Sequence, residues 1–186
     1  MDTSVFKNGF TFLWDGKLFT VLEFMNVPKP KGGSLVQAKL YNLRNGSTLN
    51  YNFTGSEKIE EVTVEKREMS YIYDEGDNAV FMNNETYEQI EIPKSQIERE
   101  LQFMIMGNTV QVRLYEGEVL GLILPDKVTL QVSDTPLGEK GNSATNTLKE
   151  ATLETGLVIR VPMFINTGDY VIINTETGKY DSRAKD

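Results

Sequence analysis

The amino-acid sequence predicts an all-β protein made of small barrels of the SH3-like or OB type. Turn signals recur at short intervals between apolar, β-branched or aromatic runs, and Asn-Gly or Asp-Gly in such surroundings indicates a hairpin. The clearest signals are Asn8-Gly9, Asp15-Gly16, Asn45-Gly46, Glu75-Gly76, Glu116-Gly117 and Thr177-Gly178. Helical periodicity is confined to residues 94–103, which follow Pro93 and carry Ile97 and Leu101 four residues apart. Many short strands with one short helix are typical of such barrels.

The segments with strand-like composition follow one another along the whole chain. In order they are residues 18–24, 35–43, 48–53, 70–73, 79–82, 109–115, 119–124, 128–132, 157–161 and 170–174. No obvious linker separates them into groups. We place one boundary near residue 64, after Glu60-Glu61, and another near residue 127, after Leu124-Pro125-Asp126. The predicted domains are therefore residues 1–63, 64–127 and 128–186.

The 186-residue sequence also limits the chemistry that the protein can perform. It contains no cysteine, which removes disulfides, thiol nucleophiles and thiolate metal sites. It contains no histidine, so the commonest general base and the commonest zinc ligand are both missing. No phosphate-binding glycine loop or nucleophile motif is present, so we expect no enzyme, no cofactor and no metal. No apolar run could span a bilayer, and we expect a cytoplasmic monomer without a membrane partner.

Charge is distributed unevenly along this chain of net charge −8. Residues 1–63 carry seven basic and six acidic side chains, whereas residues 64–127 carry six and thirteen. No Asp or Glu occurs between Glu23 and Glu57, and this window holds Lys29, Lys31, Lys39 and Arg44. A locally positive surface can bind a polyanion even on an acidic protein, because charges act strongly only within about 8–10 Å. The acidic middle would then face away from the polyanion or contact basic protein.

The stretch Val27-Pro28-Lys29-Pro30-Lys31-Gly32-Gly33-Ser34 lies inside the acid-free window. Its prolines favour an extended backbone in the first half of the stretch, and its two glycines permit a tight reversal of the chain. The stretch therefore predicts a hairpin whose tip presents the ammonium group of Lys31. Two interpretations are open: a contact surface for a polyanion, or a solvated hairpin whose lysines confer solubility.

Two long motifs in the rest of the chain identify a family. One is Tyr71-Ile72-Tyr73-Asp74-Glu75-Gly76-Asp77 followed by Phe81-Met82-Asn83-Asn84-Glu85-Thr86-Tyr87-Glu88-Gln89. The other is Lys149-x-Ala151, Gly156, Ile159-x-Val161-Pro162, Ile165, Gly168-Asp169, and then Thr177-Gly178-x-Tyr180 with Arg183. Both resemble bacterial translation elongation factor P, in its second and third domains. The same register aligns Lys31-Gly32 with the tip of the first-domain loop of that family.

The resemblance implies three barrels in an L-shaped outline that mimics tRNA. The first would be an SH3-like (KOW) barrel, and the other two would be OB folds. Such factors bind the ribosome, through rRNA and ribosomal proteins, beside the peptidyl-tRNA. There they promote peptide-bond formation and relieve stalling at consecutive prolines. The loop tip, Lys29, Pro30, Lys31, Gly32 and Gly33, would contact the CCA end of the peptidyl-tRNA. Arg183 and the Gly141-Asn142-Ser143 loop would contact RNA on the small-subunit, exit-site side.

The sequence departs from the family pattern at two places. The family has glycine before the functional lysine or arginine, whereas here Pro30 precedes Lys31. Family members often carry a modified tip lysine. The resemblance therefore makes Lys31 a candidate modification site and a lysine-modifying enzyme a candidate partner. The family also has Gly-Asp-Thr where this chain has Gly141-Asn142-Ser143. The alternative function is a general single-stranded-RNA-binding OB protein without ribosome specificity.

Aromatic residues of the middle region have two further interpretations. Tyr71, Tyr73, Phe81 and Tyr87 could form a base-stacking platform of the OB kind. They lie among acidic residues, so we favour packing in the core or between domains.

Overall fold

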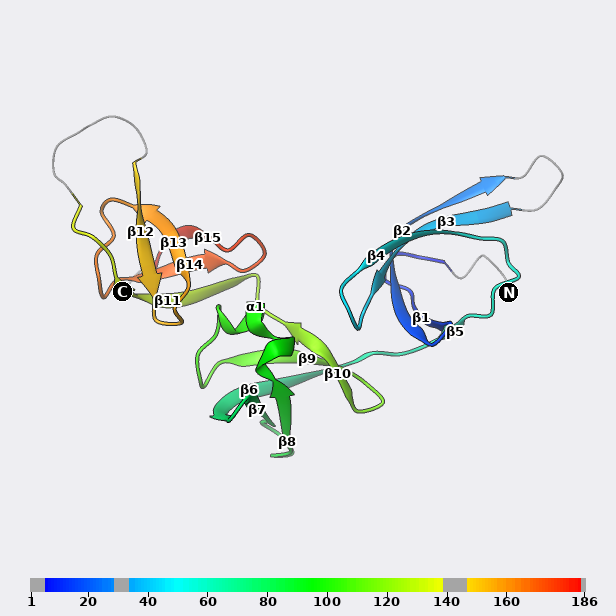
Figure 1. The fold of residues 1–186 in the computed structure, drawn as a ribbon, viewed down its shortest axis with the longest axis horizontal. Helices are drawn as coiled ribbons and strands as arrows, with labels where there is room; N and C mark the ends of the chain where they lie inside the picture. Colours follow the sequence, from blue (N-terminus) through cyan, green and yellow to red (C-terminus); the bar gives the residue numbers. More distant parts are fainter. Residues whose placement is uncertain (1–5, 29–33, 139–146, 185–186) are drawn as a thin grey trace. The chain divides into compact units, whose positions relative to one another are not determined.

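The fold is that of a computed structural model, which describes residues 6–28, 34–138 and 147–184 (Figure 1). In these residues the chain forms three sheets of five strands each, with short helical turns between two of the strands. The prediction of an all-β protein is therefore confirmed. No helix in the described part of the chain is long and apolar enough to cross a membrane.

The first sheet has the strand order β4-β3-β2-β1-β5. Its strands are β1 (Thr11–Trp14), β2 (Lys17–Pro28), β3 (Ser34–Asn42), β4 (Thr48–Phe53) and β5 (Glu60–Glu61). The predicted turn at Asp15-Gly16 joins β1 to β2, with φ of 49° and 70°. Positive φ at both positions is what a two-residue hairpin turn of type I′ requires. The core under this sheet is aromatic, and its buried rings are Phe6, Phe10, Phe12, Phe19 and Phe53.

The second sheet has the order β10-β9-β6-β7-β8. Its strands are β6 (Glu65–Glu75), β7 (Asn78–Asn83), β8 (Gln89–Pro93), β9 (Thr109–Tyr115) and β10 (Glu118–Ile123). Tyr71 and Phe81 stack in its core with ring centroids 5.3 Å apart, as the packing interpretation predicts. Tyr73 and Tyr87 are not packed in the core, since they are 41% and 72% exposed, and a contact between domains stays a prediction for them.

The predicted helix at residues 94–103 is shorter and interrupted. A 3₁₀ turn, η2 (Lys94–Gln96), is followed by the four-residue helix α1 (Glu98–Leu101). Ile97 lies between them with φ of −128°, outside the helical region. Its side chain is fully buried, and we attribute the interruption to the demands of the core.

The third sheet has the order β13-β12-β11-β14-β15. Its strands are β11 (Lys127–Asp134), β12 (Leu148–Leu153), β13 (Val158–Pro162), β14 (Tyr170–Asn174) and β15 (Lys179–Arg183). The core of this sheet includes Leu130, Leu153, Ile165 and Ile173, and Phe103 joins it from beyond α1. The strand β15 was not predicted because its sequence, Lys-Tyr-Asp-Ser-Arg, is almost entirely polar.

The chain forms two compact units by its internal contacts. One consists of Met1–Lys66 with Arg113–Gly121, and the other of Arg67–Val112 with Leu122–Asp186. The loop that joins β9 to β10 therefore belongs with the first sheet. The domain boundaries near residues 64 and 127, and the L-shaped arrangement, stay predictions.

Candidate nucleic-acid interface

The predicted basic hairpin is built by β2 and β3. These strands pair antiparallel from Phe19 opposite Asn42 to Pro28 opposite Ser34. The tip residues predicted to contact RNA, Lys29, Pro30, Lys31, Gly32 and Gly33, lie outside the described residues. Their position between two paired strands follows from the register, and their contacts stay a prediction.

A β-bulge divides strand β2 into a buried base and an exposed upper part. The register shifts between Val21 and Glu23, which leaves Leu22 as the extra residue. Before the bulge, Leu18, Phe19 and Val21 are buried, whereas the residues of β2 from Leu22 to Asn26 are exposed. A bulge bends the strand and increases its twist. On the facing strand β3, Val36 and Ala38 remain buried in the core, so the upper part of β2 is exposed while β3 stays packed.

Arg44, one of the four cations of the acid-free window, has a structural role. Its Nε lies 3.0 Å from Oε1 of Glu118, and its Nη2 lies 3.0 Å from Oε2. Nη1 also donates to the carbonyl oxygen of Gly16 at 2.9 Å. The hydrogen bond with Glu118 raises the pKa of Arg44 above its ordinary value. We conclude that Arg44 contributes little to a polyanion-binding surface, contrary to the interpretation of the window.

Two acidic residues, Glu23 and Glu57, mark the ends of the acid-free window. Glu23 lies directly opposite Lys39 in the register of β2 and β3. The carboxylate of Glu57 accepts hydrogen bonds from the backbone amides of Thr54 and Gly55 at 3.0 and 2.9 Å. Burial acts to raise the pKa of Glu57, but these hydrogen bonds outweigh it and lower the pKa. At one end of the acid-free window the carboxylate of Glu57 therefore has local partners, and at the other end Glu23 faces a lysine in the strand register.

Of the residues predicted to contact RNA on the small-subunit side, Arg183 is the one that lies in the described part of the chain. Its Nη2 lies 3.3 Å from Oδ1 of Asp169, and its side chain is half exposed. Its charge is therefore partly compensated before any RNA arrives. Gly141, Asn142 and Ser143 lie outside the described residues, so the proximity of Arg183 to them stays a prediction.

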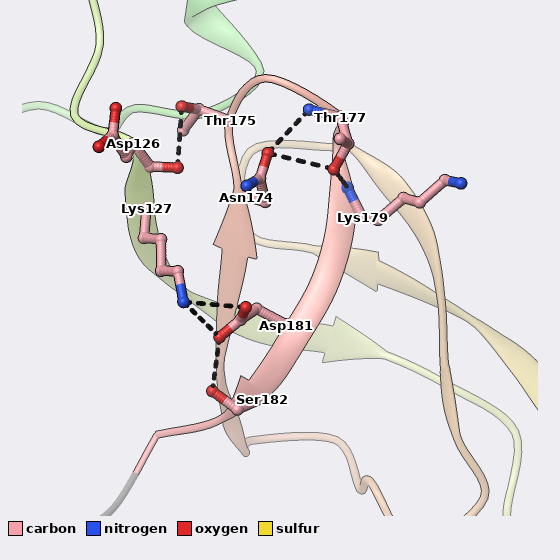
Figure 2. Close-up of polar contacts among 8 residues, drawn as sticks. All are labelled: Asp126, Lys127, Asn174, Thr175, Thr177, Lys179, Asp181 and Ser182. Atoms are coloured by element: carbon pink, nitrogen blue, oxygen red, sulfur yellow. Dashed lines mark hydrogen bonds and ion pairs between the residues drawn. The ribbon is translucent and has the colours of Figure 1, made fainter.

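Figure 2 shows Asn174 and Thr177 at the turn between β14 and β15, which also contains Gly178. Oδ1 of Asn174 accepts hydrogen bonds from the amide and the hydroxyl of Thr177 at 2.9 and 3.1 Å. Gly178 has φ of +69°, a conformation that favours glycine. On the same sheet Lys127 pairs with Asp181 at 2.9 Å. Thr177 and Gly178 of the family motif therefore shape the turn, and the nearby cation Lys127 is already paired with a carboxylate.

The turn is also bound to the segment around α1, in the same compact unit. Nη2 of Arg99 donates to the carbonyl oxygens of Thr175 and Glu176 at 2.6 and 3.1 Å. The guanidinium lies over the ring of Phe103, 5.5 Å from its centroid. Arg99 was not singled out in the sequence, because its carbonyl partners lie 76 and 77 residues away.

Lys149 of the third-domain motif is 7% exposed. Its ammonium donates to the carbonyl oxygen of Pro136 at 2.5 Å. This contact ties β12 to the segment that follows β11. A buried ammonium bonded to a carbonyl is a structural feature, and it gives a physical reason for lysine at this position of the motif.

The acidic middle region is held by ion pairs of its own. Asp74 pairs with Lys94 at 2.8 Å and accepts a hydrogen bond from the hydroxyl of Tyr71. The hydrogen bond from Lys94, followed by that from Tyr71, lowers the pKa of Asp74. Burial, together with Asp74, raises the pKa of Tyr71 to about 12. Within the described ranges no group of three or more Asp or Glu side chains could hold a metal ion.

Comparison with known proteins agrees with this geometry. The chain matches three family models: the elongation factor P KOW-like domain at residues 2–59, the elongation factor P OB domain at 64–122, and the elongation factor P C-terminal domain at 128–183. Among solved structures it is similar to eukaryotic translation initiation factor 5A from Methanococcus jannaschii. That similarity has a TM-score of 0.50 and 18% sequence identity, and it covers 66% of this chain and 92% of the other. The three matches follow one another along the chain and confirm the predicted KOW-like and OB domains, and the chain therefore belongs to the elongation factor P family of translation elongation factors.

Proposed function

We propose that this translation factor binds the ribosome beside the peptidyl-tRNA and promotes peptide-bond formation where consecutive prolines stall synthesis. The observation that carries the proposal is the match to all three domains of the family, together with the paired hairpin on which residues 29–33 lie. Lys31 would reach the CCA end of the peptidyl-tRNA. Contacts of Arg183 and the loop with Gly141, Asn142 and Ser143 on the exit-site side belong to the same proposal.

The factor would act by positioning and would not itself be an enzyme. Proline is a conformationally restricted substrate, and holding reactants in the correct geometry can recover a large part of a lost rate. Pro28 is exposed at the end of β2, and its fixed φ lowers the entropy that the hairpin loses on binding. The ribosome would supply the catalysis. A cytoplasmic monomer, and modification of Lys31 by a dedicated enzyme, complete the proposal.

Replacing Lys31 by alanine tests this mechanism. We expect Lys31→Ala to fold normally and to retain much of its ribosome affinity, because the surfaces of all three domains still bind. The rate of triproline synthesis should fall, while a proline-free reporter is translated at the wild-type rate. Lys31→Arg should restore part of the rate, since it keeps the charge but not the compact ammonium. The matched control is Lys29→Ala, which should have a smaller effect.

The measurement is in-vitro translation of a triproline reporter beside the proline-free control. A wild-type rate of triproline synthesis with Lys31→Ala would show that the loop-tip mechanism is wrong. Binding of the wild-type protein to isolated single strands as tightly as to ribosomes would favour the alternative, a general RNA-binding protein. Mass spectrometry of the native protein determines whether Lys31 is modified.

A further inference from the structure

The first sheet carries an open groove on its outer face, opposite the core. Val36, Ala38 and Phe53 are buried on the core face, and the residues between them point the other way, because side chains alternate along a strand. On the outer face, direct cross-strand partners form two rows over β2, β3 and β4, which are Met25, Gln37 and Asn52, and Glu23, Lys39 and Asn50. These side chains line a groove of about 390 Å³, near the lower end of the range for ligand pockets, roughly 300–1,000 Å³.

Three of the side chains that line the groove are exposed amides, those of Gln37, Asn50 and Asn52. Within the described part of the chain these amide groups have no hydrogen-bond partner on the protein. The amides of Asn42 and Asn174 differ, because their Oδ1 atoms accept hydrogen bonds that hold turns. Each amide has an oxygen that accepts and an NH₂ group that donates. The groove therefore presents donors and acceptors that the fold does not use.

Charge and strand order together favour RNA as the occupant of the groove. Among the described residues that line it, Glu23 alone is acidic, and it lies opposite Lys39. Residues 24–56, which include the upper part of β2 and all of β3 and β4, contain no Asp or Glu. A polyanion therefore meets little repulsion on this face, although the chain has a net charge of −8. A peptide that extends a sheet pairs with the free backbone of an edge strand, whereas β3, in the middle of the groove, is already paired on both sides.

The part of RNA that suits the amides is the ribose. Its 2′-hydroxyl is both a donor and an acceptor, and an amide can satisfy either function. Lys39 is the one cation among the described residues that line the groove, and Glu23 opposes it. Phosphates therefore gain little attraction from the groove itself, and neutral hydrogen bonds must supply the contact. Met25, which is 62% exposed, adds an adaptable apolar surface beside the amides.

We propose that this groove binds the ribose groups of an RNA strand through the amides of Gln37, Asn50 and Asn52, and thereby distinguishes RNA from DNA. The inference rests on the proposed function, which supplies the RNA, and adds a second contact on the same hairpin. The Met25–Gln37 pair lies three residue pairs from Pro28–Ser34, the last described pair, a distance of about 10 Å along the strands. The groove therefore holds the RNA strand while residues 29–33 act further along it.

The test follows the side-chain NH₂ signals of the three amides by NMR of the full ¹⁵N-labelled chain. Each signal is identified from the spectrum of a variant that lacks it. The chain is titrated with a single-stranded RNA hexamer that contains only A and C, and with the DNA hexamer of the same sequence, so that bases and charge are equal. We expect RNA to shift all three signals saturably. DNA should bind at least about threefold more weakly, because it lacks the 2′-hydroxyl.

Two variants with the same change of charge separate the groove from the rest of the sheet. Asn52→Asp should weaken binding of the RNA hexamer at least about fivefold, because it removes a donor and sets a carboxylate against the RNA. Asn26→Asp is the matched control, since Asn26 is also exposed but lies opposite buried Val36, on the core face, and does not line the groove. Its binding should stay within about twofold of wild type, as expected for a surface substitution. Thermal unfolding by circular dichroism verifies that both variants fold.

Each other result overturns the inference. Amide signals that RNA does not shift would remove the groove from the contact, and equal affinities for RNA and DNA would leave the ribose without a role. Equal affinities of Asn52→Asp and Asn26→Asp would reduce the effect to net charge. An uncharged hexapeptide that shifts the amide signals where RNA does not would identify a protein ligand instead. The proposed function is tested separately, since a wild type that binds RNA in the groove but fails on the triproline reporter would refute that function and retain the groove.

Discussion

Replacing Arg44 by methionine should destabilise the compact unit that contains the first sheet by about 1.5–2 kcal/mol. The guanidinium makes two hydrogen bonds of 3.0 Å with the carboxylate of Glu118 and donates to Gly16 at 2.9 Å. The ion pair is partly screened, because the two side chains are 38% and 47% exposed. We therefore assign it about 0.5–1 kcal/mol. The hydrogen bond to the carbonyl oxygen of Gly16 adds about 1 kcal/mol.

A double-mutant cycle isolates the ion pair from the other contacts of Arg44. The proteins are the wild type, Arg44→Met, Glu118→Gln and the double variant, unfolded by urea with Trp14 fluorescence as the probe of the first unit. We expect a coupling energy of about 0.5–1 kcal/mol at low salt. It should fall in about 1 M NaCl, where the Debye length is only about 3 Å. Arg44→Lys should recover only part of the stability, since an ammonium cannot match both carboxylate oxygens.

The contacts of Arg44 predict which of the two single variants is less stable. Arg44→Met removes the ion pair and the Gly16 contact, whereas Glu118→Gln removes the charge of one partner only. A coupling energy of zero at low salt would refute the assigned role of the pair. Greater destabilisation by Glu118→Gln than by Arg44→Met would refute the contribution of Gly16. Since Arg44 is paired in the fold, its replacement should also change ribosome affinity less than Lys31→Ala does.

Three further predictions concern the middle region. The hydrogen bond from Lys94 lowers the pKa of Asp74 below its ordinary value of 3.8. The stabilising contribution of Asp74 is therefore present above pH 3.8 and is lost as the pH falls through the lowered pKa. Urea unfolding at a series of pH values should show that Asp74→Asn loses less stability than the wild type as the pH falls. Phe81 is fully buried, and Phe81→Ala should lower the free energy of unfolding by about 3–5 kcal/mol. The measurement is urea unfolding followed by circular dichroism, since Trp14 lies in the other compact unit. A cost below about 1 kcal/mol would be incompatible with a packed core. Glu88→Lys should change salt-titrated ribosome binding less than Lys31→Ala, and a dominant effect of Glu88 would contradict an acidic surface that faces away from RNA.

Local features of the sequence were sufficient to predict the class of the fold and the family. The turn at Asp15-Gly16 could be predicted because its residues tolerate the positive φ that they adopt, 49° and 70°. Strands 48–53, 109–115 and 170–174 have the predicted bounds, since their composition and flanking turns are local signals. The motifs that indicated the family are likewise continuous in the sequence. The predicted contact residues at 29–33 and 141–143 lie outside the described residues, so these predictions rest on the resemblance.

The role of each polar or aromatic residue was decided by partners far away in the sequence. Arg44 looked like part of a basic surface, but its carboxylate partner lies 74 residues away on β10. Lys149 could not be recognised as buried, nor Phe24 as exposed, from the composition of their strands. Which strands become neighbours, and where a bulge shifts their register, depends on how the whole apolar core is buried. A local pattern specifies turns and strands, whereas the assembled sheets determine which charges are paired and which rings are buried or exposed.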